Sequence, residues 1–117
     1  MKKLLLLSLT LIFISISSCK KEKKESDSIK GTTWSRPITS TTKDYLVFTT
    51  SREGYNKEEW EDNGQIYYDI MDFEYEYSNG EGYVDYVDSN LSGFDFTVSG
   101  NKLTVEYNGQ TFVYTKE

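Results

Sequence analysis

The sequence predicts an all-β domain, built as an antiparallel up-and-down meander of about eight strands. Its ten tyrosines and six phenylalanines, with many threonines and valines, suit a pleated, half-buried surface. The chain contains no alanine, the best helix former, and one proline. Three dipeptides typical of tight hairpin turns separate stretches of alternating apolar and polar residues: Asn79-Gly80, Gly100-Asn101 and Asn108-Gly109. Eight such strands are enough to close into a small barrel.

The first 18 residues have the pattern of a secretory signal. A short basic start, Met1-Lys2-Lys3, precedes a run of about 15 mostly apolar residues, which is short for a membrane span. The segment Ile16-Ser17-Ser18-Cys19 resembles the lipobox of bacterial lipoproteins. This resemblance implies cleavage before Cys19 and lipidation of its thiol and new amino terminus. The alternative is an uncleaved anchor in which the thiol is incidental.

Residues 19–29 join the signal to the domain. Residues 20–28, KKEKKESDS, are charged and lack aromatic and aliphatic side chains, so we expect a flexible tether. Two or more acyl chains on Cys19 would make membrane attachment stable. Surface-exported lipoproteins of the Bacteroidota resemble one another in having acidic residues just after the cysteine, whereas lysines follow Cys19 here. We therefore expect a lipid-anchored protein of the bacterial cell envelope that faces the periplasm, with surface exposure as the alternative.

The domain itself is expected over residues 30–117. Its first strands are predicted at 31–36, 43–50 and 54–61, and the last two are joined by the turn Ser51-Arg52-Glu53-Gly54.

A long bent strand is predicted over 65–77. The Asn79-Gly80 turn places Phe73 opposite Tyr86 and Tyr75 opposite Val84, with Tyr77 on the same side. Upstream, the apolar positions alternate in the opposite parity: Ile66, Tyr68 and Ile70. One extra residue near Asp69–Asp72 would bring both sets to one face, so the pattern predicts a β-bulge there.

The last three strands, over 93–116, form the clearest part of the predicted meander. Counting outwards from Gly100-Asn101 pairs Val98 with Leu103 and Phe96 with Val105. Counting from Asn108-Gly109 pairs Val105 with Phe112 and Leu103 with Tyr114. Both counts put Leu103, Val105 and Tyr107 on one face, and a one-residue slip would turn that whole face to water.

A family resemblance supports the same fold. The segments IKGTTW (29–34), YLVFTTSREGY (45–55) and FTVSGNKLTVEYNGQTFVYTKE (96–117) resemble the small lipocalin-like lipoproteins of the Bacteroidota. These proteins have a tryptophan in the first strand and a β-meander that ends in a V-S-G-N-K-L-T hairpin. The resemblance implies an up-and-down barrel that binds an apolar molecule.

The charge distribution excludes some partners. Residues 30–117 contain 7 Lys or Arg and 16 Asp or Glu, a net charge of −9, and the stretch from Glu58 to Asn101 has 12 acidic residues and no basic one. Nucleic acid is disfavoured as a partner because contacts to phosphates need Lys and Arg. A basic protein or a cation fits this charge better, and a solvated surface that binds neither is the alternative.

The residue types also argue against an enzyme. The chain has no histidine, which removes histidine-based general base catalysis and histidine metal ligands. With Cys19 lipidated no thiol nucleophile is left, and no serine lies in a G-x-S-x-G setting. We expect no catalytic residues.

Aromatic residues supply the first candidate binding site. Many are predicted to point into the barrel: Phe73, Tyr75, Tyr77, Tyr86, Phe94, Phe96, Tyr107, Phe112 and Tyr114. A pocket among them would take a small apolar ligand, with tyrosine hydroxyls as its polar contacts. The candidate ligand-binding residues are Tyr55, Trp60, Tyr75, Tyr77 and Tyr86. The alternative is that the rings fill the barrel as a solid core.

Carboxylates supply the second candidate. The hairpin register puts Glu74 opposite Asp85, with Asp72 and Glu76 beside Glu74. Like charges opposite one another destabilise a sheet, whereas a Ca²⁺ ion takes six to eight oxygen ligands. Asp72, Glu74 and Asp85 are therefore a candidate calcium site. The alternative is a solvent-screened acidic surface, and no other cofactor is expected.

Two functions remain open. The leading hypothesis is a membrane-anchored, non-enzymatic binding module that takes up a small apolar ligand at one mouth of its barrel. The alternative is an acidic protein-interaction module, such as an inhibitor of a cationic periplasmic or secreted enzyme. In either case we expect a monomer.

Overall fold

The computed structural model describes residues 28–117, which form a closed eight-stranded barrel in sequence order. All neighbouring strands are antiparallel, so the predicted all-β, lipocalin-like meander is confirmed. The strands are β1 (Thr32–Pro37), β2 (Thr42–Phe48), β3 (Glu53–Asp62), β4 (Gln65–Ser78), β5 (Glu81–Tyr86), β6 (Phe94–Ser99), β7 (Lys102–Tyr107) and β8 (Gln110–Lys116).

The predicted signal peptide, Cys19 and most of the predicted tether lie outside the described residues. Ile29, assigned to the tether from the sequence, is buried in the barrel core, so the packed chain begins one residue before the predicted domain. In the part of the chain that the structure describes, no helix is long and apolar enough to cross a membrane.

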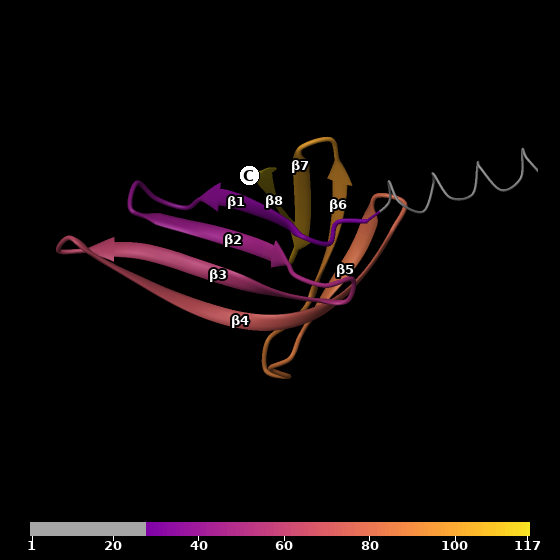
Figure 1. The fold of residues 1–117 in the computed structure, drawn as a ribbon, viewed down its shortest axis with the longest axis horizontal. Coiled ribbons are helices and arrows are strands. Elements are labelled where there is room, and N and C mark those ends of the chain that lie inside the picture. Colours follow the sequence, from indigo (N-terminus) through magenta and orange to yellow (C-terminus); the bar gives the residue numbers. More distant parts are fainter. Residues whose placement is uncertain (1–27) are drawn as a thin grey trace, which may run out of the picture.

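The barrel consists of two unequal halves. Strands β1 to β4 lie side by side, and strands β6 to β8 cross them steeply (Figure 1). The hairpin of β3 and β4 is the longest, with strands of 10 and 14 residues, and it extends beyond the rest of the barrel at one end. The halves meet where β1 pairs with β8. Trp34 and Ser35 pair there with Lys116 and Thr115, and the Glu117 N–H donates to the Thr33 carbonyl at 2.9 Å. The barrel is therefore closed by a short seam.

Asparagine-glycine turns connect three of the hairpins. Asn79-Gly80 and Asn108-Gly109 have positive φ at both residues, as type I′ turns require, and so confirm two predicted turns. Asn63-Gly64 forms a third turn of this kind, between β3 and β4. At Gly100-Asn101 only the glycine has positive φ, which is the requirement of a type II′ turn.

The predicted pairing of the last strands is confirmed. Val98 pairs with Leu103 and Phe96 with Val105. Val105 also pairs with Phe112 across the next hairpin. Two-residue turns fix the register because each allows only one pairing of the flanking residues, and burial of one face penalises any slip.

The predicted β-bulge in the long strand is wrong. Strand β4 pairs with β3 in one unbroken register, from Gln65 opposite Asp62 to Glu74 opposite Glu53. Without an extra residue the side chains keep strict alternation, so Phe73 points inward and Ile66, Tyr68 and Ile70 point outward. These three are 65%, 60% and 49% exposed, respectively. Alternating apolar residues here mark an outer apolar stripe on a strand that extends past the core.

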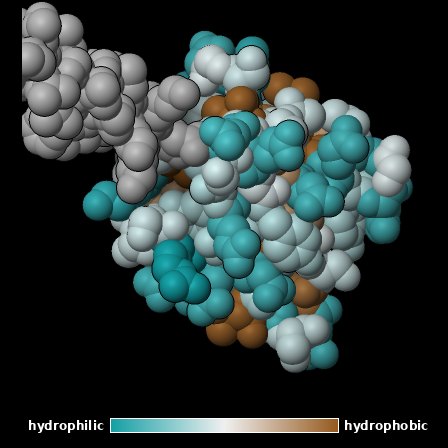
Figure 2. Space-filling view, turned by 90° about the vertical axis from the view of Figure 1, so that its right-hand side faces the viewer, coloured by the Kyte–Doolittle hydropathy of each residue, from teal (hydrophilic) through white to brown (hydrophobic). Residues whose placement is uncertain are grey.

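The core fills one end of the barrel. Phe48 lies at its centre and contacts the rings of Phe73, Tyr75 and Phe96 at centroid distances of 5.6, 4.8 and 5.6 Å. All eight strands and every core side chain of this structure belong to residues 28–117, so this segment carries its own core, as an independently folding domain does. In Figure 2, which views the molecule from the side of the β4–β5 turn, hydrophobic residues show only as small separate groups.

Two glycines make room for core rings. The ring of Phe96 covers Gly82 so closely that an added Cβ would lie 2.3 Å from its Cζ atom. The ring of Phe73 covers Gly54 in the same way, at 2.8 Å from Cε1. Both rings therefore occupy space that a side chain would take at these strand positions.

Candidate functional site

The open end of the barrel contains a pocket of about 260 Å³. This end carries the β1–β2, β3–β4, β5–β6 and β7–β8 connections, opposite the filled core. The pocket is lined mainly by apolar and aromatic side chains with a few polar groups: Arg36, Met71, Tyr86, Leu91, Ser92, Phe94, Val105, Tyr107, Phe112 and Tyr114. Such a mixture is typical of sites for small molecules, and the volume lies just below their usual range of roughly 300–1,000 Å³.

Arg36 is the only charged residue that lines this pocket. Its guanidinium carbon lies 4.6 Å from the ring centroid of Phe112 and 5.6 Å from that of Tyr114. Its Nε atom is buried and has no hydrogen-bond partner among the described residues. Within residues 28–117 the ion pairs are Lys43–Glu117 and Lys57–Glu59, and Arg36 takes part in neither. In this part of the chain, Arg36 therefore forms no salt bridge at the mouth, although Asp44 lies directly opposite it on β2.

A polar network forms the floor beside Arg36. The buried amide of Asn56 donates hydrogen bonds to Asp44 Oδ1 and to the Tyr45 carbonyl, each at 2.8 Å. Its Oδ1 atom accepts a hydrogen bond from the Tyr86 hydroxyl at 3.0 Å. The Tyr114 hydroxyl donates to the other oxygen of Asp44. Because both Asp44 oxygens accept from neutral donors, the carboxylate holds Tyr114 and the Asn56 amide in fixed positions, and Asn56 in turn holds Tyr86.

The two tyrosines of this network remain protonated to unusually high pH. Burial, together with the charges of Asp44 and Tyr107, raises the pKa of Tyr86 to about 12. Burial also raises the pKa of Tyr114, and Asp44 adds to the rise through its charge and its hydrogen bond, while Arg36 opposes it. Both hydroxyls are therefore neutral donors at physiological pH.

Of the five aromatic residues predicted to bind a ligand, Tyr86 lines the mouth and two others lie in the filled end. Tyr75 is buried, and its hydroxyl donates to the Thr50 carbonyl at 2.6 Å. Tyr77 stacks on Phe96 with an interplanar angle of 2°. These two rings take part in the solid core that the sequence left as the alternative.

The remaining two lie outside the pocket. Tyr55 points to the outer face of β3, opposite Val47 on β2 and Asp72 on β4. Trp60 lies near the end of β3 and stacks on Tyr67 of β4, at a centroid distance of 6.1 Å. Neither residue lines the pocket that contains Arg36, and Trp60 lines a separate pocket of about 320 Å³ beside the β1–β2 turn.

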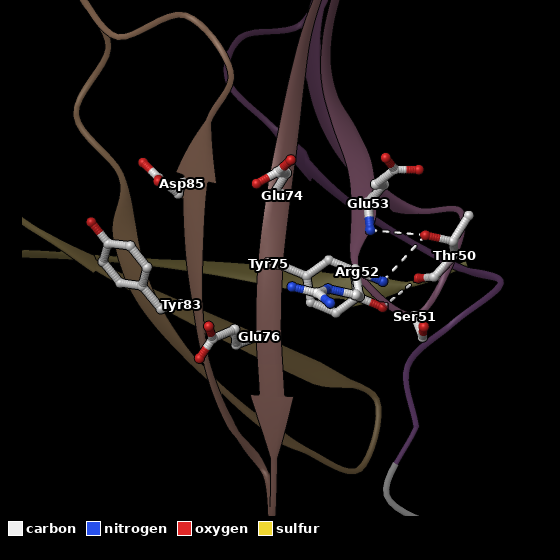
Figure 3. Close-up of a pocket in the computed structure, with 9 residues that line it drawn as sticks. All are labelled: Thr50, Ser51, Arg52, Glu53, Glu74, Tyr75, Glu76, Tyr83 and Asp85. Carbon is white, nitrogen blue, oxygen red and sulfur yellow. Dashed lines mark hydrogen bonds between the residues drawn. The ribbon is translucent and has the colours of Figure 1, made fainter.

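The acidic residues predicted to form a calcium site lie on the outer surface of the barrel, away from the pocket at the mouth. Glu53, Glu74 and Asp85 occupy neighbouring positions on β3, β4 and β5, and their carboxylates form a row in Figure 3. They line a groove of about 770 Å³ together with Thr50, Ser51, Arg52, Tyr75, Glu76 and Tyr83. Asp72 does not line this groove. Among residues 28–117 no group of three or more acidic, histidine or cysteine side chains lies close enough to hold a metal ion.

Sequence reasoning missed Arg36, Asp44 and Asn56, although the pattern contained a signal for the first two. Arg36 is two residues after the buried Trp34, and Asp44 is two residues before the buried Leu46. Strand alternation therefore places both side chains on the inner face. Apolar residues were used to recognise that face, so polar residues of the same parity were overlooked.

The chain matches no known family model, and no significant match to it is found among curated proteins or solved structures.

Proposed function

We propose that this protein is a membrane-anchored, non-enzymatic binding lipoprotein whose barrel mouth takes up one small amphipathic molecule. The ligand would have an apolar body and an acidic head group. The observation that carries the proposal is the Arg36 guanidinium inside an aromatic pocket, where its buried Nε has no hydrogen-bond partner and the side chain forms no salt bridge among the described residues.

The wall of the pocket suits an apolar body. Met71, Leu91, Phe94 and Val105 line it, and burial of apolar ligand surface against such residues contributes about 25 cal/mol per Å². The filled end of the barrel limits the depth of entry. A ligand of modest size, such as a short-chain or single-ring molecule, fits this space better than a long lipid.

The head group is assigned from Arg36. Its guanidinium is a fixed fork of donors that matches a carboxylate, and stacking on Phe112 holds that fork in place. The neutral hydroxyls of Tyr86 and Tyr114 lie in the same pocket and can donate to a ligand once their present acceptors are shared. An uncharged apolar molecule would leave the Nε of Arg36 without a hydrogen-bond partner, at a cost in affinity.

The membrane anchor is part of the proposal and depends on the lipobox-like segment ending at Cys19. The described chain begins beside Phe48, where Gly31 N–H donates to the Phe48 carbonyl, at the end opposite the mouth. A tether attached there would direct the mouth away from the membrane, toward the periplasm.

The test uses residues 28–117 and the fluorescent probe 1-anilinonaphthalene-8-sulfonate, which has an apolar aromatic body and an anionic group. Substitution Arg36→Met removes the charge and keeps an apolar side chain of similar length. We expect it to weaken probe binding about tenfold, the loss of one charge-assisted hydrogen bond. The matched control is Arg52→Met, at the other end of the barrel, which should bind the probe like the wild type.

A competition series then identifies the head group. Octanoate should displace the probe, and uncharged octanol should do so much less well. Equal binding by wild type and Arg36→Met, or equal competition by octanoate and octanol, would contradict the proposed ligand class.

A second candidate function follows from the acidic groove. Three carboxylates directly opposite one another on adjacent strands are unfavourable in a sheet, and they line a groove of about 770 Å³, which is larger than the pocket that contains Arg36. An acidic groove with an exposed Tyr83 fits a basic partner protein. Binding of a cationic lysozyme that falls steeply with salt and is lost in Glu74→Lys would support this function. Absence of binding at low salt would exclude that partner.

A further inference from the structure

Strand β4 has an open edge near the mouth of the barrel. Residues 65–74 pair with β3 on one side, whereas β5 pairs only with residues 73–78 on the other. One further contact, from the Val87 N–H to the Asp72 carbonyl at 3.0 Å, ends the second ladder. Residues 65–71 are therefore paired on one side only, and Gln65 to Ile70 are all exposed.

The free backbone groups of this edge belong to three residues. The Asn63-Gly64 turn makes Asp62 and Gln65 a hydrogen-bonded pair, so odd-numbered residues of β4 direct their N–H and C=O groups to β3. The Asp72 carbonyl, which bonds Val87 on the other side, confirms this alternation. Ile66, Tyr68 and Ile70 therefore direct their backbone groups to the open edge.

The same three residues carry the exposed apolar side chains on the outer face of β4, and Tyr67, which is also exposed, alternates with them on the other face. Charged residues, proline or a bulge protect many natural edge strands, and QIYYDIM (65–71) has one charge, no proline and no bulge. Free backbone groups and apolar side chains at the same positions make this edge a template for another strand.

We propose that the open edge of β4 pairs with the β4 edge of a second copy of this chain, antiparallel and centred on Tyr68. In this register Tyr68 lies opposite its own copy, and Ile66 lies opposite Ile70 of the other copy. All three pairs use the outward backbone groups, so each copy both donates and accepts at Ile66, Tyr68 and Ile70. The two β3–β4 hairpins become a four-stranded sheet with one apolar stripe.

The charges on both faces of the strands are compatible with this register. On the outer face, Lys57 lies beside Ile70 and Glu61 beside Ile66 on β3. The two-fold pairing aligns Lys57 with Glu61 of the other copy across the two β4 strands, and it aligns Glu59, which lies beside Tyr68, with Glu59 of the other copy. These aligned charges are three strand spacings apart, roughly 14 Å, so water and salt screen them. On the inner face it places Asp69 opposite Tyr67, so no like charges lie directly opposite one another.

The association is expected to be weak. Two seven-residue strands bury much less surface than the roughly 1,200–2,000 Å² of a stable interface. The net charge of −9 on residues 30–117 also opposes the approach of two copies. Dimer formation should therefore depend on high local concentration, which a shared membrane surface would supply.

Cysteine cross-linking of residues 28–117, which contain no cysteine, tests the register directly. A hydrogen-bonded antiparallel pair has a Cα–Cα distance of about 5.5 Å, within the range of a disulfide. We expect Tyr68→Cys to form a covalent dimer under mild oxidation about tenfold faster than Tyr83→Cys, because the thiols are prealigned. Tyr83 is a matched control, since it is also exposed but its strand is paired on both sides.

Two further variants distinguish the register from random collision. Ile66→Cys and Ile70→Cys should each cross-link slowly alone, because identical residues are then about 14 Å apart along the strands. A mixture of the two should give the mixed dimer quickly. Equal rates for Tyr68→Cys and Tyr83→Cys, or fast cross-linking of Ile66→Cys alone, would overturn the proposal. In that case the open edge of β4 would instead be expected to pair with an extended segment of a different protein.

Discussion

At the residue scale, the barrel depends on glycines that lie beneath aromatic rings. Gly82 and Phe96 share one volume, and the carbonyl of Glu76 is also only 2.6 Å from where a Cβ would lie. Phe96 cannot move away freely because its other side packs on Phe48 and Tyr77.

Gly82→Ala should therefore lower the free energy of unfolding by about 1–3 kcal/mol, the cost of overpacking a core. Urea denaturation of residues 28–117 measures it. Gly109→Ala provides a comparison in which no atom lies within 4 Å of the added Cβ, so its cost arises from positive φ alone. A fully neutral Gly82→Ala would show that the ring and the backbone can shift.

Also at the residue scale, ionisation of the Tyr86 hydroxyl makes the stability of the fold depend on pH in the alkaline range. Its pKa is raised to about 12 in the folded protein, above the ordinary value of 10.0. The stability that this difference contributes is fully present below pH 10 and is lost as the pH rises from 10 through about 12.

Tyr86→Phe should be less stable than wild type at pH 8, by about 1 kcal/mol for the lost hydrogen bond to Asn56. It should also lose less stability than wild type between pH 9 and pH 11.5, so the two curves converge. Chemical denaturation at a series of pH values checks this. Parallel curves would mean that Tyr86 ionises equally in both states.

At the scale of elements, strand β4 has two different faces along its length. Its inner face packs into the core through Phe73, whereas its outer face shows Ile70 to solvent. The unbroken register with β3 keeps these faces apart.

Phe73→Ala should destabilise the barrel by about 3–5 kcal/mol, and Ile70→Ala by less than about 1 kcal/mol. Thermal unfolding in dilute solution, where self-association is minimal, measures both. A bulge between the two residues would instead make Ile70 a core residue, and the two variants would then have similar costs.

At the scale of the whole molecule, acidic residues outnumber basic ones and gather on one surface. Glu53, Glu74 and Asp85 lie directly opposite one another on neighbouring strands, so their charges repel. Within residues 28–117 only two exposed or half-exposed ion pairs offset this repulsion, Lys43–Glu117 and Lys57–Glu59. Repulsion between exposed charges is screened over a Debye length of about 8 Å at physiological ionic strength.

Stability should therefore increase with salt. We expect the urea midpoint of residues 28–117 to rise between 10 mM and 300 mM sodium chloride, conditions between which the Debye length falls from about 30 Å to well under 10 Å. Glu74→Gln should reduce this salt dependence, because it removes the central charge of the row. A midpoint that falls with salt would show that attractive ion pairs outweigh the repulsion.

Local rules in the chain predict most of the strands. Asparagine-glycine turns and strict alternation give the pairing of Val98 with Leu103 and of Phe73 with Tyr86 without any knowledge of the third dimension. These rules work because a two-residue turn and a buried face each allow one register. They fail at Ile66–Ile70, where alternation reports an apolar surface and not a core.

The sequence by itself determined the fold class, the strand order and the register of the three hairpins at Asn79-Gly80, Gly100-Asn101 and Asn108-Gly109, because these depend on neighbours along the chain. Only the tertiary structure decided which end of the barrel is filled and which is open. That outcome depends on side chains from distant strands, with Phe48, Phe73 and Phe96 meeting at one end and Arg36, Asn56 and Tyr114 at the other. Strand stagger and ring volume, summed around a closed sheet, set those meetings, and no single stretch of sequence contains them.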